Sequence, residues 1–148
     1  VLDLLARQGV AASAIATIAP GEGLESRHDV KLVGYLSRAD VRAEMLRATC
    51  VVMPSLAETI CLPLVEAMAL SVPVVAADRP YAREVCGEAG TYFNPGSAED
   101  FAAAIMSVWK ERELVGARLA AGHIQAARFT GAEAFQALVA ASIAQEGP

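Results

Sequence analysis

Residues 50–77 read CVVMPSLAETICLPLVEAMALSVPVVAA, and this stretch decides the fold class of the chain. Cys50–Met53 is a short apolar run that ends at a Pro-Ser pair, which is typical of a buried strand. Leu62–Leu70 has the composition of a helix, with Pro63 in the first turn, where proline is tolerated. Pro73–Ala77 is a second apolar run and predicts the next strand. A strand, a helix and a strand in this order predict two parallel strands joined by a helical crossover.

The same alternation continues on both sides of this unit. Ser37 and Ser97 each precede an aspartate by three positions, and this capping-box spacing marks the start of a helix. Five apolar strands separated by helices predict an α/β fold, in which helices cover both faces of a doubly wound parallel sheet. We also expect a helical C-terminus. The remaining strands are predicted at Ala14–Ala19, Val30–Val33 and Thr91–Phe93, and the remaining helices at Val1–Gln8, Ser37–Ala48, Tyr81–Cys86, Ser97–Lys110, Glu113–Arg128 and Thr130–Ala144.

The composition limits the classes of protein to which the chain can belong. It has 148 residues with 55% hydrophobic and 20% charged residues, which predicts one folded domain and excludes a disordered chain. The net charge of -5 argues against nucleic acid as a partner, because phosphate contacts need clustered Lys and Arg. No apolar stretch reaches the roughly 18 residues of a membrane span, and no signal peptide is recognisable. We therefore expect a cytoplasmic protein.

The cysteines do not indicate a disulfide framework or a metal site. Cys50, Cys61 and Cys86 are odd in number and lack C-x-x-C spacing, and the chain has only two histidines. We expect three buried or half-buried thiols in a reducing compartment and no bound metal.

Two acidic residues stand where this fold class places ligands. Glu58 lies between the predicted strand and helix of the 50–77 unit, and Glu66 lies about one turn into the helix. The N–H groups of a helix N-terminus favour a phosphate, and carboxylates accept hydrogen bonds from the hydroxyls of a sugar or ribose. Because Pro63 separates the two acids, we expect Glu58 to project from the loop. The pattern alone leaves open that both acids are surface residues without a ligand.

Several other residues have predicted roles that the pattern does not decide. Asp78 follows a strand, where it can contact a ligand or cap the next helix. Arg83 and Glu84 are expected to form a solvated pair on a helix. Trp109 is expected in the core with neighbouring apolar residues of the closing helices.

The segment Pro54–Ala76 resembles a sequence signature of the group 1 (family 4) retaining glycosyltransferases, which have the GT-B fold. That family reads P-S-x-x-E-G-F-G-L-P-x-x-E-A-M-A-x-G-x-P-V-V-A, and this chain reads PSLAETICLPLVEAMALSVPVVA. The similarity extends upstream over Val30–Val41 and downstream over Asp78–Asp100. It implies a Rossmann-like domain, the C-terminal half of a GT-B fold, that binds a nucleotide-diphosphate sugar as donor substrate without a cofactor or a metal.

The resemblance also implies roles for individual residues. Glu58 matches the first Glu of the motif, which lies near the donor sugar and is the implied catalytic residue. Glu66 matches the second Glu, which binds the hydroxyls of the ribose. The other implied donor-binding positions are the loop residues Thr59, Ile60, Cys61 and Leu62, which would face the diphosphate, and the turn residues Gly34, Tyr35 and Leu36, which would meet the edge of the base.

The chain departs from the family pattern in ways that define a second hypothesis. Thr59 and Cys61 replace two glycines that allow close approach of the backbone to a diphosphate, and Ser71 replaces a third glycine. A non-catalytic or degenerate nucleotide- or sugar-binding module is therefore the alternative to a glycosyltransferase. A different GT-B enzyme, such as a sugar-nucleotide epimerase, would lack the two-glutamate motif.

The resemblance further implies that part of the enzyme precedes this chain. The chain opens on a helix at Val1, whereas a doubly wound domain normally opens on a strand, and the family carries basic residues for the diphosphate in and after that strand. We expect residues 1–148 to be one donor-binding domain that lacks its first strand and the N-terminal acceptor-binding domain. The isolated chain should fold and be inactive alone, and its parent should work in the cytoplasm or peripherally at the membrane face.

Overall fold

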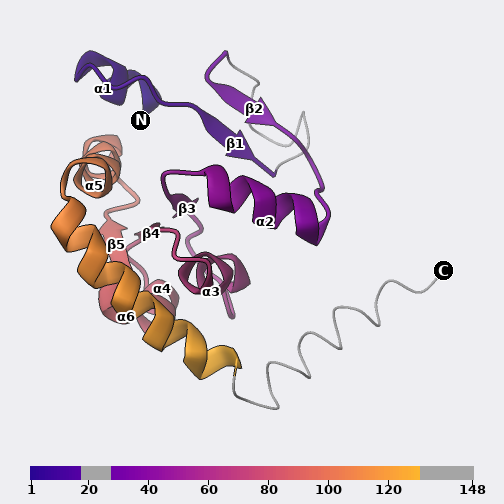
Figure 1. Cartoon of the computed structure of the whole chain (residues 1–148). Coiled ribbons are helices and arrows are strands. Elements are labelled where there is room, and N and C mark those ends of the chain that lie inside the picture. The colour runs from indigo at the N-terminus through magenta and orange to yellow at the C-terminus, as the bar shows by residue number, and fades with distance from the viewer. Residues whose placement is uncertain (18–27, 131–148) are drawn as a thin grey trace.

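The computed structural model describes residues 1–17 and 28–130 of the chain (Figure 1). The end of the predicted Ala14–Ala19 strand lies outside the described residues, as does most of the predicted Thr130–Ala144 helix. The helices are α1 (Leu2–Arg7), α2 (Arg38–Arg47), α3 (Leu62–Ala69), α4 (Pro80–Cys86), α5 (Ala98–Lys110) and α6 (Arg112–Thr130), with a 3₁₀ turn, η1, at Gly87–Ala89. The strands are β1 (Ala14–Ala16), β2 (Val30–Leu32), β3 (Val51–Met53), β4 (Val74–Ala77) and β5 (Gly90–Phe93).

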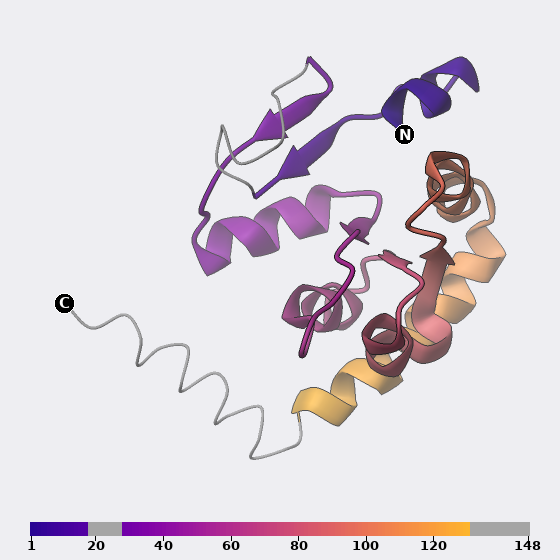
Figure 2. The same cartoon turned by 180° about the vertical axis from the view of Figure 1, so that it is seen from behind.

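The α/β fold class is confirmed, and all strand pairs of the described chain are parallel. The strands form two sheets: β1 pairs with β2 in one, and β3, β4 and β5 form the other in that order. In both views the strands follow one another as β2, β1, β3, β4, β5 (Figures 1 and 2). The sheet is therefore divided between β1 and β3.

The central strand β4 is apolar throughout because it is covered on both faces. Val74 and Ala76 point into a core formed with side chains of α2, α3, α4 and α6. Val75 and Ala77 point to the other face, into a core formed with β5 and α5. Successive side chains of a strand alternate between faces, so an unbroken apolar run is the pattern that a strand between two helical layers requires.

The sheet formed by β1 and β2 is less well covered than the sheet around β4. Ile15 in β1 is 48% exposed, whereas all four residues of β4 are buried. A separate small core joins α1 to α5 through Leu5, Ala102 and Met106. This packing connects the first helix with residues about 100 positions later in the sequence.

Both predicted capping boxes are present at the expected helix starts. Ser37 precedes α2, and its hydroxyl oxygen accepts the N–H of Asp40 at 3.2 Å. Ser97 precedes α5 and accepts the N–H of Asp100 at 3.0 Å. The prediction for Trp109 is wrong, because its side chain is 51% exposed. Trp109 is the residue before the last in α5, and it lies on the exposed side of this amphipathic helix.

Ser71 explains why a glycine is usual at its position in the resembled family. It lies between α3 and β4 with a φ of 57°, in the left-handed region that favours glycine. Its hydroxyl is hydrogen-bonded to Nε2 of His123 in α6, with 2.7 Å between the two atoms. This hydrogen bond joins the turn between α3 and β4 to α6.

Replacing Ser71 by glycine and by alanine is expected to separate these two effects. Both variants remove the hydroxyl, but only alanine keeps a Cβ in the left-handed region. We expect Ser71→Gly to be more stable than Ser71→Ala by about 1 kcal/mol. Urea unfolding followed by circular dichroism measures the difference, and equal stability of the two variants would show that the turn is unstrained.

Candidate functional site

The loop from Pro54 to Cys61 joins the carboxyl end of β3 to the N-terminus of α3 and carries Glu58. One side chain from a later element holds this loop in place. The hydroxyl of Tyr81, in the first turn of α4, donates a hydrogen bond of 2.8 Å to the carbonyl oxygen of Ser55. Ser55 in turn donates from its hydroxyl to the carbonyl oxygen of Ala57. The predicted ligand loop is therefore tied to α4, which follows the neighbouring strand β4.

Glu58 lies in the loop, outside α3, as expected from the position of Pro63. It is exposed, yet its charge acts on two groups beneath it. Burial raises the pKa of the Cys61 thiol, and the negative charge of Glu58 raises it further. Burial also raises the pKa of the Tyr81 hydroxyl, with smaller contributions from Cys61 and Glu58. The charge of Glu58 thus acts on both Tyr81 and Cys61 at the start of α3 and α4.

The N-terminus of α3 leaves a small number of backbone donors for a ligand. The N–H of Leu62 donates to the carbonyl oxygen of Ile60, and Pro63 has no N–H. The next two N–H groups donate to the carbonyl oxygen of Cys61. Within the described part of the chain, no hydrogen bond engages the N–H groups of Ile60 and Cys61. These two N–H groups are the donors that an anion at this helix end would meet.

The two residues that replace glycines in this loop fit it without left-handed backbone. In the described part of the chain, Ser71 is the only non-glycine residue with a positive φ, so Thr59 and Cys61 do not need the freedom of glycine. Cys61 is 2% exposed and packs in the core with α3 and α4. Its side chain therefore does not cover the open side of the loop, whereas Thr59 is exposed.

Glu66 lies on the exposed side of α3, one turn after the helix begins. Val65 and Ala67, the residues before and after it, are buried in the core. Their burial leaves Glu66 on the side of α3 that faces solvent. Carboxylates on an exposed helix face next to a ligand loop can accept hydrogen bonds from a pair of hydroxyls.

The predicted base-edge turn, Gly34-Tyr35-Leu36, follows β2 and so belongs to the other sheet. Gly34 has a φ of 63°, which a glycine adopts without strain. The side chain of Tyr35 is 87% exposed. The structure therefore brings Glu58, Glu66 and residues 59–62 together around one helix start, while residues 34–36 lie beyond the division between the two sheets.

A polar hollow of about 350 Å³ opens at the carboxyl ends of β4 and β5, on the same edge of the sheet as the loop. Arg83 lines it and donates two hydrogen bonds to Asp78, at 2.7 and 2.8 Å. Its guanidinium carbon lies 3.9 Å from the centre of the Tyr92 ring. The hydrogen bonds from Arg83 lower the pKa of the Asp78 carboxyl.

These contacts correct one prediction from the sequence and exclude one of two alternatives that the sequence left open. Arg83 pairs with Asp78, five residues earlier, and does not form the expected pair with Glu84. The residue before α4 is Arg79, so Asp78 does not cap that helix. Asp78 directly follows β4 and lies next to Arg83 in α4. Helix periodicity does not predict a contact between a residue outside the helix and one within it.

Arg79 is the polar residue of this edge that the sequence argument left without a role. It lines the hollow, and its Nε atom is buried without a hydrogen-bond partner in the described part of the chain. Its position directly after an Asp at a strand end is the signal that could have drawn attention to it. Chemically, Arg79 can donate a charge-assisted hydrogen bond to an acceptor in the hollow.

The cysteines follow the expectation of buried thiols. Cys61 and Cys86 are buried, Cys50 is half-buried, and none of the three forms a disulfide. Burial raises the pKa of Cys50 to about 11, and burial is also the main cause that raises the pKa of Cys86 to about 12. Among the described residues there is no His, Cys, Asp and Glu cluster that could hold a metal ion. None of the described helices is both long and apolar enough to span a bilayer.

Replacing Tyr81 by phenylalanine is expected to loosen the Glu58 loop without opening a cavity. The variant removes the donor to Ser55 and should lower the free energy of unfolding by about 0.5–1.5 kcal/mol. Amide hydrogen exchange of residues 55–61 should become faster. Unchanged exchange in the loop of Tyr81→Phe would contradict the assigned role of the hydroxyl.

One family model matches the part of the chain that contains the candidate site. The family model described as "Glycosyl transferases group 1" matches residues 21–122, about two thirds of the chain. The matched range contains Glu58, Glu66, Arg79 and the turn at residues 34–36. No curated protein matches the chain.

Proposed function

Because the chain belongs to the group 1 glycosyl transferases, we propose that it is the domain of such an enzyme that binds a nucleotide-diphosphate sugar. The observation that carries this proposal is the start of α3, at one edge of a parallel sheet, with Glu58, Glu66 and two backbone N–H groups that no hydrogen bond engages in the described part of the chain. Carboxylates suit the hydroxyls of a sugar and a ribose, and the helix N-terminus suits the diphosphate between them. The donor sugar would be a hexose or a deoxyhexose.

In this proposal each residue acts on a different part of the donor. Glu58 lies at the transferred sugar and is the catalytic residue, and Glu66 binds the ribose hydroxyls. The N–H groups of Ile60 and Cys61 stabilise the charge that develops on the diphosphate as the sugar leaves. The reaction transfers the sugar with retention at the anomeric carbon to an acceptor glycan or lipid. Positioning and charge stabilisation then supply the catalysis, with no metal or cofactor assigned.

We further propose that the domain is completed by a strand between β1 and β3. The doubly wound order 3-2-1-4-5-6 fits the five strands if β1 to β5 are its second to sixth members, and the position of the first then falls at the division of the sheet. The half-buried residues of β3 and the exposed Ile15 of β1 support an added neighbour. Residues upstream of Val1 in a longer cytoplasmic protein would supply this strand and the acceptor-binding domain.

Hydrogen exchange tests the added strand. In the 148-residue chain we expect fast exchange of backbone amides on the edges of β1 and β3 that face the division. In the protein expressed from its complete reading frame, the same amides should become protected. Equal exchange in both proteins would contradict a strand at this position and leave the donor site untouched.

Titration of the chain with UDP, GDP and ADP sugars tests the proposed donor binding. We expect weak binding of one nucleotide class, observed as shifts of the amide resonances of residues 58–66 in NMR spectra. The complete protein should bind the same nucleotide more tightly, because the phosphate-binding residues of the first strand are then present.

A second candidate function is a degenerate module that no longer transfers sugar. The exposed Thr59 favours this alternative, because it adds a β-branched side chain to the loop where the family has a glycine. If the complete protein binds no nucleotide, the module is degenerate. If Thr59→Gly then restores binding, the threonine is the cause.

A further inference from the structure

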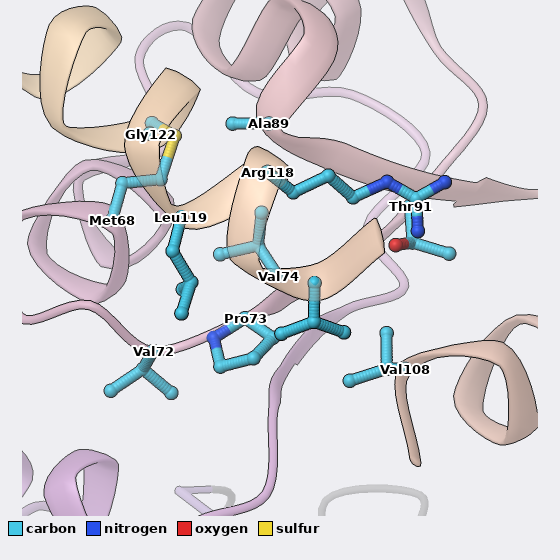
Figure 3. A pocket seen from close by; sticks show the side chains of 11 residues that line it. Met68, Val72, Pro73, Val74, Ala89, Thr91, Val108, Arg118, Leu119 and Gly122 are labelled. Atoms are coloured by element: carbon cyan, nitrogen blue, oxygen red, sulfur yellow. The ribbon is translucent and has the colours of Figure 1, made fainter. Parts of the chain in front are cut away.

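A small cavity lies beneath α6, away from the proposed donor loop, between that helix, β5 and the end of α3 (Figure 3). Its volume is about 10 Å³. Most of the lining is apolar, contributed by residues such as Met68, Val74, Val108 and Leu119. A single water molecule requires on the order of 10–15 Å³, so the cavity has room for one water and little else.

Two polar side chains interrupt the apolar lining. Figure 3 shows the guanidinium of Arg118, from α6, extending across the cavity toward the side chain of Thr91, from β5. Thr91 is only 6% exposed, and among the described residues it is the buried residue with a polar side chain. The two residues are 27 positions apart in the sequence, and the packing of α6 against β5 brings their side chains together.

Neither polar group has a hydrogen-bond partner in the described part of the chain. The Oγ1 atom of Thr91 and the Nη1 atom of Arg118 are both buried, and no protein atom satisfies them. Buried polar atoms in folded proteins are almost always hydrogen-bonded to protein or to ordered water, because an unsatisfied group keeps the full cost of its desolvation.

We infer that this cavity binds one water molecule, which joins Arg118 of α6 to Thr91 of β5. The water oxygen accepts a hydrogen bond from Nη1 of Arg118, and the water donates one of its protons to Oγ1 of Thr91. The bridge satisfies both buried atoms and fastens α6 to the strand at the edge of the main sheet. The site is separate from the proposed donor site and does not depend on that function.

A crystal structure of the chain at about 1.5 Å or better tests the water directly. We expect one spherical density peak within about 2.6–3.2 Å of both Arg118 Nη1 and Thr91 Oγ1. Crystals soaked in bromide should give no anomalous signal at the peak. A bromide signal would show that the site binds an anion. A direct hydrogen bond between Arg118 and Thr91 would show that no water joins the two side chains. Either result, or a cavity without density, overturns the inference.

A double-mutant cycle tests the bridge in solution. Thr91→Val removes the hydroxyl and keeps the shape, and Arg118→Met removes the guanidinium while keeping the apolar stem. Each single variant leaves one partner of the water buried, so each should lower the urea midpoint. The double variant should recover most of the loss, because it replaces both polar partners by apolar groups. Additive losses would overturn the inference. Thr91→Ser is the matched control and should keep both the water and the coupling to Arg118.

Discussion

Replacing Glu66 by alanine is expected to weaken nucleoside-diphosphate binding by about 1.5–3 kcal/mol, which is the range for hydrogen bonds to a charged group. This corresponds to a loss of affinity of roughly 10- to 150-fold. The reason is that Glu66 is exposed one turn into α3, the helix that follows the Glu58 loop, and a carboxylate can accept from two ribose hydroxyls at once. Calorimetric titration of the complete protein with the preferred nucleotide measures the change.

Two controls make this result specific to Glu66. Glu84→Ala removes an exposed glutamate from α4 and should leave the affinity unchanged. A nucleotide with 2′-deoxyribose should lose affinity for the natural protein and lose little more for Glu66→Ala, because the variant no longer has the partner of that hydroxyl. An affinity of Glu66→Ala equal to that of the natural protein would remove Glu66 from the donor site.

Leu64→Ala is expected to have the largest effect on stability, a loss of about 2–5 kcal/mol in the free energy of unfolding. Leu64 is 0% exposed and belongs to the core that α3 shares with α4 and α6. Truncation leaves a cavity in the first turn of α3, next to the loop that carries Glu58. Urea unfolding followed by circular dichroism and by Trp109 fluorescence measures the loss.

Leu56→Ala is the matched control for this variant. Leu56 lies in the same loop-and-helix segment but is 63% exposed, so its truncation should change stability by less than about 0.5 kcal/mol. If both leucine variants lose the same stability, the first turn of α3 does not pack as described.

The local elements of this protein could be predicted from the sequence because their signals lie within a few residues. The S-x-x-D spacing predicts the starts of α2 and α5, and the hydroxyls of Ser37 and Ser97 make the expected cap hydrogen bonds. The unbroken apolar run of β4 predicts a strand covered on both faces, and Val74 and Val75 do point into different cores. The place of Glu58 outside α3 also follows from local chemistry, since Pro63 favours the first turn of a helix.

Contacts between distant residues could not be predicted in this way. Tyr81 and Ser55 are 26 positions apart, and no periodicity connects a helix tyrosine with a loop carbonyl. Arg83 in α4 pairs with Asp78 in the turn after β4, and neither the spacing of a helix nor that of a strand predicts this pair. Trp109 lies at the C-terminal end of an amphipathic helix, and only the packing of α5 decides that this apolar side chain is exposed.

The sequence by itself determined which elements form, their order and the two acidic residues of the proposed donor site, because caps, turns and apolar runs act over short distances. Only the tertiary structure decided how these elements meet. It divided the strands into two sheets, left residues 34–36 beyond that division from Glu58 and Glu66, placed Arg79 at the polar hollow and enclosed Thr91 with Arg118. The physical reason is that burial and hydrogen bonding between distant segments depend on the packing of the whole chain, and no local pattern records that packing.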